Sequence, residues 1–260
     1  MTFRLIHLAA PAASFAALAA AVPAAAQDQG DPWAGWYVGA NLGANWGDSS
    51  ISGTVLPGTG AILVPPSSVA VINAVGRGSS NKTEFTGGIE GGYNYRIGNW
   101  LLGVETDFVA LNVDDRKTLT VQSTLLTTPP LVITNLLDQR ATTNWMWSLR
   151  PRVGYVFGPL LVYGTAGIAT SNIKVALGFS DNLVPQNVVL SENSKTKTGW
   201  IAGLGAGYAL NPRVSVKGEY LYADFGSISN TAFSPTSLVN LSSEAKVKSN
   251  ILRVGLDYRF

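Results

Sequence analysis

Apolar and polar residues alternate along several stretches of this chain. In the last ten residues, ILRVGLDYRF, the apolar face consists of Leu252, Val254, Leu256, Tyr258 and Phe260. The same period of two residues recurs at 35–47, 82–96, 100–110, 144–156, 160–170, 197–210 and 214–223. A period of two predicts β-strands whose two faces meet different surroundings. We therefore expect an all-β fold of eight antiparallel strands, each with about the 9–11 residues that a tilted strand needs to cross a bilayer.

The connections between these stretches are short and long in turn. Short turns lie at Gly98, 157–159 and 211–212, where Gly, Pro and Asn favour tight bends. Long links occupy 47–81, 112–138, 171–196 and 226–247. This asymmetry is typical of outer-membrane barrels, which have short periplasmic turns and long extracellular loops. β-branched runs in the links, such as 131–134, indicate that strands can continue above the membrane.

The composition of the two faces distinguishes a soluble barrel with an apolar interior from a barrel in lipid. Only 13% of the residues are charged, about half the share of a typical soluble protein. The strand charges gather on the face that is rich in glycine, which suits a crowded interior better than a solvated exterior. Aromatic residues of the apolar face form two bands, one near the turns (Trp36, Tyr95, Trp100, Tyr155, Tyr208, Tyr258, Phe260) and one near the loops (Trp46, Phe85, Phe108, Trp145, Trp200, Tyr222). Membrane barrels carry two such bands, so we expect a transmembrane β-barrel whose apolar face meets lipid.

The first residues of the chain predict an export signal. Arg4 precedes an apolar stretch rich in Ala and Leu, and a run of alanines ends at Ala26. Signal peptidase requires small residues of this kind. We expect cleavage after Ala26, which makes 1–26 a signal peptide, 27–34 a short periplasmic segment and 35–260 the barrel. The chain contains no cysteine, which excludes disulfides and thiolate metal sites.

Five segments carry a family likeness: GWYVGANLGANWG, LVYGTAGIA, GWIAGLGAGYAL, VKGEYLYADFG and ILRVGLDYRF. They resemble the small outer-membrane β-barrel family of alphaproteobacteria, whose barrel is similar to that of OmpA. The terminal strand, with Tyr258 and Phe260, looks like the signal that the barrel-assembly machinery recognises. The resemblance implies a porin-like protein of the Gram-negative cell outer membrane. Its expected partners are outer-membrane lipid and lipopolysaccharide, the assembly machinery, and surface ligands bound through the loops.

The inward face of the expected barrel carries charges of both signs. We predict a lumen charge network made of Glu84, Glu90, Arg96, Glu105, Asp107, Arg150, Arg152, Lys217, Glu219, Arg253, Asp257 and Arg259. An eight-stranded barrel is just wide enough for its own side chains to fill, and charges in so narrow a space are costly unless they are paired. One interpretation is a set of salt bridges that closes the barrel. The other is a narrow pore, selective or gated.

Three functions are open at this point. The first is an integral outer-membrane protein with a role in envelope structure and surface interaction, and the second is a low-conductance porin for ions or small solutes. The third is a receptor for haem or another ligand through the extracellular loops, because some members of the resembled family are associated with haem binding. Haem usually takes an axial His, Met or Cys, and more rarely Tyr. After the signal peptide the chain offers Met146 and tyrosines.

Catalysis is not among these functions. The single histidine, His7, lies in the predicted signal peptide, so the mature chain has no histidine to act as a general base. We predict no catalytic, cofactor-binding or metal-binding residues and no cofactor. A formal net charge of +2, with no run of Lys or Arg, gives no electrostatic footprint for nucleic acid.

Overall fold

Nearly every residue that the structure describes lies in a β-strand. The computed structural model describes residues 30–57, 77–80, 83–125, 131–181, 189–234 and 239–260, and the expected signal peptide lies outside them. The strands are β1 (Gly35–Pro57), β2 (Arg77–Ser80), β3 (Thr83–Ile97), β4 (Trp100–Leu125), β5 (Leu131–Phe157), β6 (Leu160–Asp181), β7 (Val189–Ala209), β8 (Val214–Ser234) and β9 (Val239–Arg259). In the described ranges, no helix has the length and apolar character needed to span a membrane.

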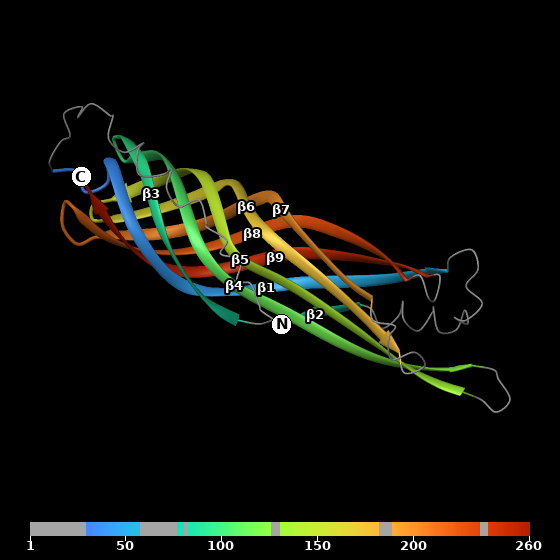
Figure 1. The fold of residues 1–260 in the computed structure, drawn as a ribbon. Helices are drawn as coiled ribbons and strands as arrows, with labels where there is room; N and C mark the ends of the chain where they lie inside the picture. The colour runs from blue at the N-terminus through green and yellow to red at the C-terminus, as the bar shows by residue number, and fades with distance from the viewer. Residues whose placement is uncertain (1–29, 58–76, 81–82, 126–130, 182–188, 235–238) are drawn as a thin grey trace, which may run out of the picture. The chain divides into compact units, whose positions relative to one another are not determined.

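The strands close into an antiparallel barrel. Each long strand pairs with the next along the chain, and β9 pairs with β1 to complete the ring (Figure 1). The short β2 pairs with β1 through Ser80 and Ser49, in the same register as the pairing of Thr83 in β3 with Trp46. β2 therefore continues the line of β3, and eight strands form the barrel wall. Closure leaves no unpaired edge at the level where lipid would surround it.

The short turns follow from the residues that occupy them. Ile97 pairs with Trp100, and Phe157 pairs with Leu160, so each of these hairpins has a loop of two residues. The first loop residues are glycines with positive φ, 61° at both Gly98 and Gly158. Two-residue hairpin loops require this conformation, which glycine adopts without strain. These turns define the end of the barrel that we call the turn end; the opposite end is the loop end.

The strands extend far past the lengths that the alternation indicated. β4 has 26 residues and β5 has 27, whereas a tilted strand crosses the hydrocarbon core with about 10. Their pairing runs to Leu125 and Leu131, and β8 pairs with β9 as far as Ser234 and Val239. Much of the expected loop sequence is therefore strand, in line with the β-branched runs noted above.

The barrel divides into two sheets toward the loop end. Pairing between β3 and β4 stops at Thr86 and Leu111, and pairing between β7 and β8 stops at Trp200 and Asp224. The other neighbouring strands continue to pair beyond this level. There, the described strand segments form one sheet of β4 to β7 and another of β8, β9, β1 and β2. Both separations begin at the level of the loop-side aromatic band. Above that level water can bind an open strand edge, which lipid cannot do.

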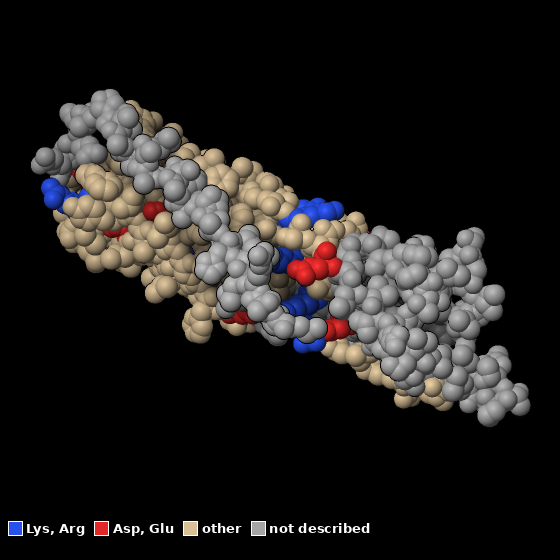
Figure 2. All heavy atoms as spheres, viewed as in Figure 1, with Lys and Arg blue, Asp and Glu red and all other residues tan. Residues whose placement is uncertain are grey.

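The apolar face lies on the outside of the barrel. Phe85 is 92% exposed and Leu204 is 71% exposed, and uncharged atoms cover most of the described surface visible in Figure 2. Rings of the expected bands contact one another, most of them across neighbouring strands. The contacts are Trp100–Tyr155 and Tyr258–Phe260 at the turn end, and Phe108–Trp145 and Trp200–Tyr222 at the loop end. An exposed apolar belt between two aromatic bands is the surface of a barrel in a bilayer.

Candidate functional site in the barrel interior

The interior of the barrel consists of three layers along its axis. On β4, for example, the inward side chains change from Leu101 at the turn end to Glu105 and Asp107 at mid-strand, and to Val109 and Leu111 at the loop end. The turn-side layer contains Trp33, Leu101, Val156, Leu161 and Tyr163. The loop-side layer contains Val109, Leu111, Met146, Ala169, Ile173, Val175, Ile201, Leu221, Ala223, Phe225, Ile228 and Ile251. Charged residues lie between these two apolar layers.

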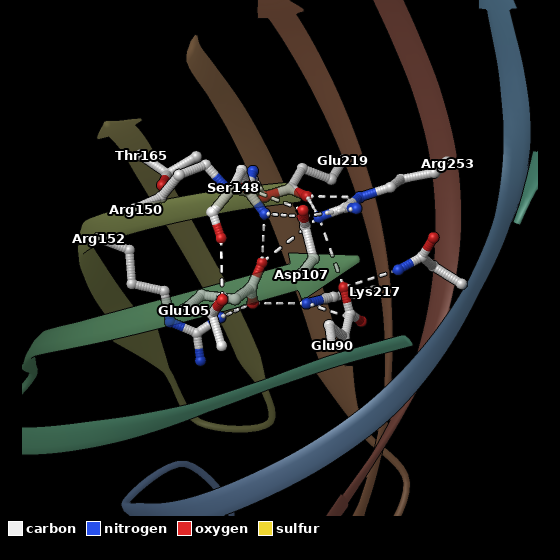
Figure 3. Close-up of polar contacts among 12 residues, drawn as sticks. Glu90, Glu105, Asp107, Ser148, Arg150, Arg152, Thr165, Lys217, Glu219 and Arg253 are labelled. Carbon is white, nitrogen blue, oxygen red and sulfur yellow. Dashed lines mark hydrogen bonds and ion pairs between the residues drawn. The ribbon is translucent and has the colours of Figure 1, made fainter. Parts of the chain in front are cut away.

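The central, charged layer draws on five strands. Figure 3 shows side chains of β3, β4, β5, β8 and β9 pointing toward one another. Strand register brings opposite charges side by side, because Glu105 lies opposite Arg150 and Glu219 lies opposite Arg253. Cross-strand pairs of opposite charge stabilise a sheet, and a two-residue period keeps each partner on the inner face.

Glu105 is the carboxylate that contacts the largest number of cations in this layer. Its carboxylate lies 2.6 Å from Nη2 of Arg150, 2.7 Å from Nζ of Lys217 and 3.1 Å from Nη1 of Arg152. The Tyr37 hydroxyl donates a further hydrogen bond of 2.7 Å to it. Burying a carboxylate is costly unless its lone pairs are used. Nη2 of Arg253 lies 3.4 Å away as well, and the contacts to four cations and a hydroxyl offset that cost.

Arg253 is the corresponding cationic centre. Its Nε donates to Glu219 at 2.8 Å, and its Nη1 lies 2.9 Å from Asp107. Arg150 contacts Asp107 at 2.7 Å as well, and the Ser148 hydroxyl donates to the same carboxylate at 2.8 Å. Each carboxylate is thus shared by several donors, so the layer is a connected network rather than a set of separate pairs.

Glu90 completes the layer from β3. Its carboxylate lies 3.0 Å from Nζ of Lys217 and accepts a hydrogen bond of 3.0 Å from Nδ2 of Asn41. Asp257 lies 3.6 Å from the same lysine nitrogen. These residues are buried, so their charges interact through protein rather than through bulk water, which strengthens each pairing.

Glycines on the inner face provide the space for these long side chains. A Cβ at Gly255 would lie 2.9 Å from Oε1 of Glu90 and 3.2 Å from Cε of Lys217. A Cβ at Gly103 would collide with Asn94 and crowd Arg152. Gly103 and Gly255 are therefore positions over which side chains of the charged layer lie, whereas other inward glycines lie beneath uncharged side chains, as Gly205 does beneath Tyr163.

Three of the twelve predicted network residues lie apart from the charged layer. Arg96 is near the turn end, where its Nη1 pairs with Asp31 at 3.1 Å. Arg259 is buried at that end, with its guanidinium 5.7 Å from the centre of the Trp33 ring. Glu84 is half-buried near the loop end of β3. The structure brings the other nine together: Glu90, Glu105, Asp107, Arg150, Arg152, Lys217, Glu219, Arg253 and Asp257.

Several interior residues were not predicted from the sequence to contact the charged layer. Tyr37, Asn41, Asn94 and Ser148 all bind members of the charged layer. They share the inward face of their strands with the charges, so the alternation alone could have identified them had uncharged polar residues been considered. Trp33 precedes the first alternating stretch, and no sequence pattern points to it.

The charged layer includes three carboxylates at metal-binding distance from one another. Ligand atoms of Glu90, Glu105 and Asp107 lie within 4.8 Å of each other. Their oxygens contact Lys217, Arg150 and other cationic groups instead. A metal ion would have to displace these side chains, so the arrangement is that of an ion-pair network.

Comparison with known proteins agrees with this architecture. The model of the outer membrane protein beta-barrel domain matches residues 13–260. The chain is similar to the 31 kDa outer-membrane immunogenic protein of Brucella melitensis, with 33% identity over 183 residues that cover 68% of this chain and 66% of the relative. It is also similar to the 22 kDa outer membrane protein of Rhizobium leguminosarum, with 31% identity over 143 residues that cover 55% and 54%. The chain therefore spans about two thirds of the first relative and about half of the second.

Two solved structures show low overall similarity to this fold. OprG of Pseudomonas aeruginosa has a TM-score of 0.45 and 13% identity, over 89% of this chain and 99% of that one. Neisserial surface protein A has a TM-score of 0.37 and 16% identity, over 87% and 98%.

Proposed function

This chain belongs to the outer membrane protein beta-barrel domain family, and we propose that it serves the outer membrane as a closed structural barrel with an interactive outer surface. Its place is the cell outer membrane, as for the relatives named above. Those names describe outer-membrane proteins rather than enzymes.

The layered interior is the observation that supports a closed barrel. The charged side chains are paired, and an apolar layer lies on each side of them. An apolar constriction gates a channel by excluding water. Two such layers in series oppose a continuous water path, which a porin requires. The described interior therefore favours the structural role over the narrow porin.

Single-channel recording in a planar bilayer tests this proposal. The refolded mature chain is compared with Glu105→Ala and with Glu192→Ala, which changes an exposed position of β7. Heat-shifted migration on a gel first verifies that each barrel has formed. We expect no steady channels from the parent or from the Glu192 control, and no steady channels from Glu105→Ala, because both apolar layers remain. Steady parent channels whose ion selectivity changes on removal of Glu105 would establish the porin instead.

The haem receptor receives less support from the interior. Met146, the methionine offered by the mature sequence, is buried in the loop-side layer among apolar side chains. The loops that a receptor would use include 58–76 and most of the predicted surface loop 51–80, which fall outside the described residues.

The outer surface supports an interaction with lipopolysaccharide, the partner expected from the resemblance. Above the loop-side aromatic band, Arg116 of β4 lies directly opposite Arg140 of β5, and both are exposed. Lys174 of β6 lies opposite Thr142, two residues from Arg140 on the same strand face. Asp138 pairs with Arg116 at 2.6 Å on this face, and the phosphates of lipopolysaccharide would be further anionic partners for these exposed cations. We propose this group, Arg116, Arg140 and Lys174, as the lipopolysaccharide-facing cluster.

A further inference from the structure

The segment before β1 enters the barrel. Asp31 to Ala34 lie at the turn end, and Trp33 is only 3% exposed. Its indole packs with Leu101, Val156 and Leu161 in the turn-side layer. The sequence predicted these residues to be part of a periplasmic segment ahead of the barrel, so the burial of an aromatic ring here calls for a physical explanation.

Polar contacts hold this segment in place. The backbone N–H of Trp33 donates to Asp31 at 2.9 Å, and its carbonyl accepts a hydrogen bond of 3.0 Å from Nδ2 of Asn94. Asp31 pairs with Arg96 of β3 at 3.1 Å. The Arg259 guanidinium, from the last strand, lies 5.7 Å from the centre of the indole ring. Both ends of the barrel chain thus contribute to the position of Trp33.

Gly207 of β7 leaves space in the barrel wall for the indole of Trp33. A Cβ at this position would lie 3.0 Å from Cη2 and 3.2 Å from Cζ3 of the Trp33 ring. Any side chain larger than glycine would therefore press on the ring. Residues of β4, β5, β6, β7 and β9 border the indole, and Asn94 of β3 binds the Trp33 carbonyl, so the binding position of Trp33 is complete only in a closed barrel.

The indole of Trp33 packs closely against the barrel wall, but the polar contacts that hold it and its segment are weak. Among the described residues, the buried Nε1–H of Trp33 has no hydrogen-bond partner, and leaving such a donor unpaired opposes its burial. The side chains of the ion pair that anchors the segment are 27% exposed for Arg96 and 15% for Asp31. Salt and water weaken an ion pair with that exposure.

We propose that Asp31 to Ala34 form a releasable stopper, which closes the turn-side mouth and controls periplasmic access to the charged layer. Release of Trp33 removes the largest side chain of the turn-side layer. Water then reaches Tyr163 and Arg152, whose guanidinium lies 5.2 Å from the centre of the Tyr163 ring. The loop-side layer keeps its contacts, so release opens one end of the barrel without forming a through-channel. This inference goes beyond the proposed closed barrel.

Cysteine labelling tests the stopper, because the chain has no native cysteine. Val156→Cys reports on the turn-side layer, and Ala223→Cys reports on the loop-side layer. Each reporter is placed in the refolded mature chain in lipid nanodiscs, with Trp33 intact or changed to Ala or Phe. Labelling by a small charged methanethiosulfonate reagent is followed by mass spectrometry, and heat-shifted migration verifies folding.

The stopper predicts a change at one reporter only. We expect Trp33→Ala to speed labelling of Val156→Cys at least tenfold, Trp33→Phe to restore most of the protection, and Ala223→Cys to stay protected throughout. Asp31→Asn, which breaks the ion pair without changing the ring, should speed Val156→Cys labelling by a smaller factor. Equal labelling of Val156→Cys with and without the indole would overturn the proposal. Equal acceleration at both reporters would also overturn it, since that result indicates general loosening of the barrel.

Discussion

A single carboxylate, Glu105, connects much of the barrel interior. It contacts side chains from β1, β5, β8 and β9, including Tyr37, Arg150 and Lys217. Strands that are distant in sequence are therefore tied to one another at mid-barrel, across the lumen rather than through the backbone ladder. Loss of this charge would leave buried cations short of a partner, which is more costly than loss of an exposed charge.

We predict that Glu105→Gln lowers the free energy of unfolding by about 3–5 kcal/mol, the usual cost of breaking a buried ion pair. The exposed position Glu192→Gln serves as the matched control, and we expect it to change the same quantity by no more than about 0.5 kcal/mol. Equilibrium unfolding in urea, followed in lipid vesicles by heat-shifted migration, measures both. Similar values for the two variants would contradict a central role for Glu105.

The charged interior residues show which features could be predicted from the sequence and which could not. Alternation identifies which side chains point inward, and this sufficed to select Glu105 and Arg150. It gives no height along the barrel axis, because height depends on how far neighbouring strands are shifted. Arg96 and Glu84 share the inward face with Glu105, yet they lie at opposite ends of β3 and away from the charged layer.

At the scale of elements, the parts of β4 to β6 beyond the loop-side aromatic band carry exposed cationic side chains. Arg116 is 63% exposed and pairs with Asp138 at 2.6 Å. The hydrogen bond from Arg116 lowers the pKa of the Asp138 carboxyl from its usual value. Asp138 is therefore ionised and paired with Arg116 at neutral pH. The test replaces Arg140 and Lys174 and keeps Arg116, so that the ion pair with Asp138 is preserved.

We predict that Arg140→Gln combined with Lys174→Gln weakens binding of lipopolysaccharide. A cation near an anionic membrane surface contributes about 1 kcal/mol, so each replacement should weaken binding roughly fivefold. Native mass spectrometry with lipid A and with its dephosphorylated form measures the effect. Lys246→Gln, an exposed cation on β9, is the control, and it should retain the parent affinity. The proposed cluster fails if dephosphorylation weakens binding but the double variant does not.

These outer strand segments were the least predictable part of the fold. Their outward positions carry residues such as Thr118, Thr120 and Gln122, which are exposed. The outward face of β4 thus lacks, at these positions, the apolar residues that contact with lipid imposes on the membrane-spanning parts. Backbone pairing holds them as strands, and the propensity of Thr and Val for strands is one local signal for this.

At the scale of the whole molecule, the two terminal strands close the barrel. β1 and β9 pair from Tyr37 and Arg259 to Pro57 and Val239, and the N–H of Phe260 donates to the carbonyl of Trp36. The binding position of Trp33 is complete only when this seam is closed, because Arg259 of β9 borders the indole ring. The end of the last strand also lies at the point where the sequence predicted an assembly signal.

The predicted assembly signal is exposed, so its role in recognition can be tested separately from any role in stability. The Phe260 side chain is 63% exposed, and its ring contacts Tyr258 on the lipid-facing surface at a centroid distance of 5.7 Å. A residue so placed contributes little to interior packing. If the assembly machinery reads Phe260, its loss should impair assembly in cells far more than refolding in vitro.

We predict that Phe260→Ala reduces the amount of assembled barrel in the outer membrane at least fivefold, while unfolding of the refolded protein changes by less than about 1 kcal/mol. Phe85→Ala is the matched control, because Phe85 is a lipid-facing Phe at the loop end. Heat-shifted migration of outer-membrane fractions measures assembly, and urea unfolding in vesicles measures stability. Equal assembly defects in both variants would show that the loss of an aromatic ring at the membrane surface is responsible. A defect confined to Phe260→Ala, with stability retained, would show that this residue acts as an address for assembly.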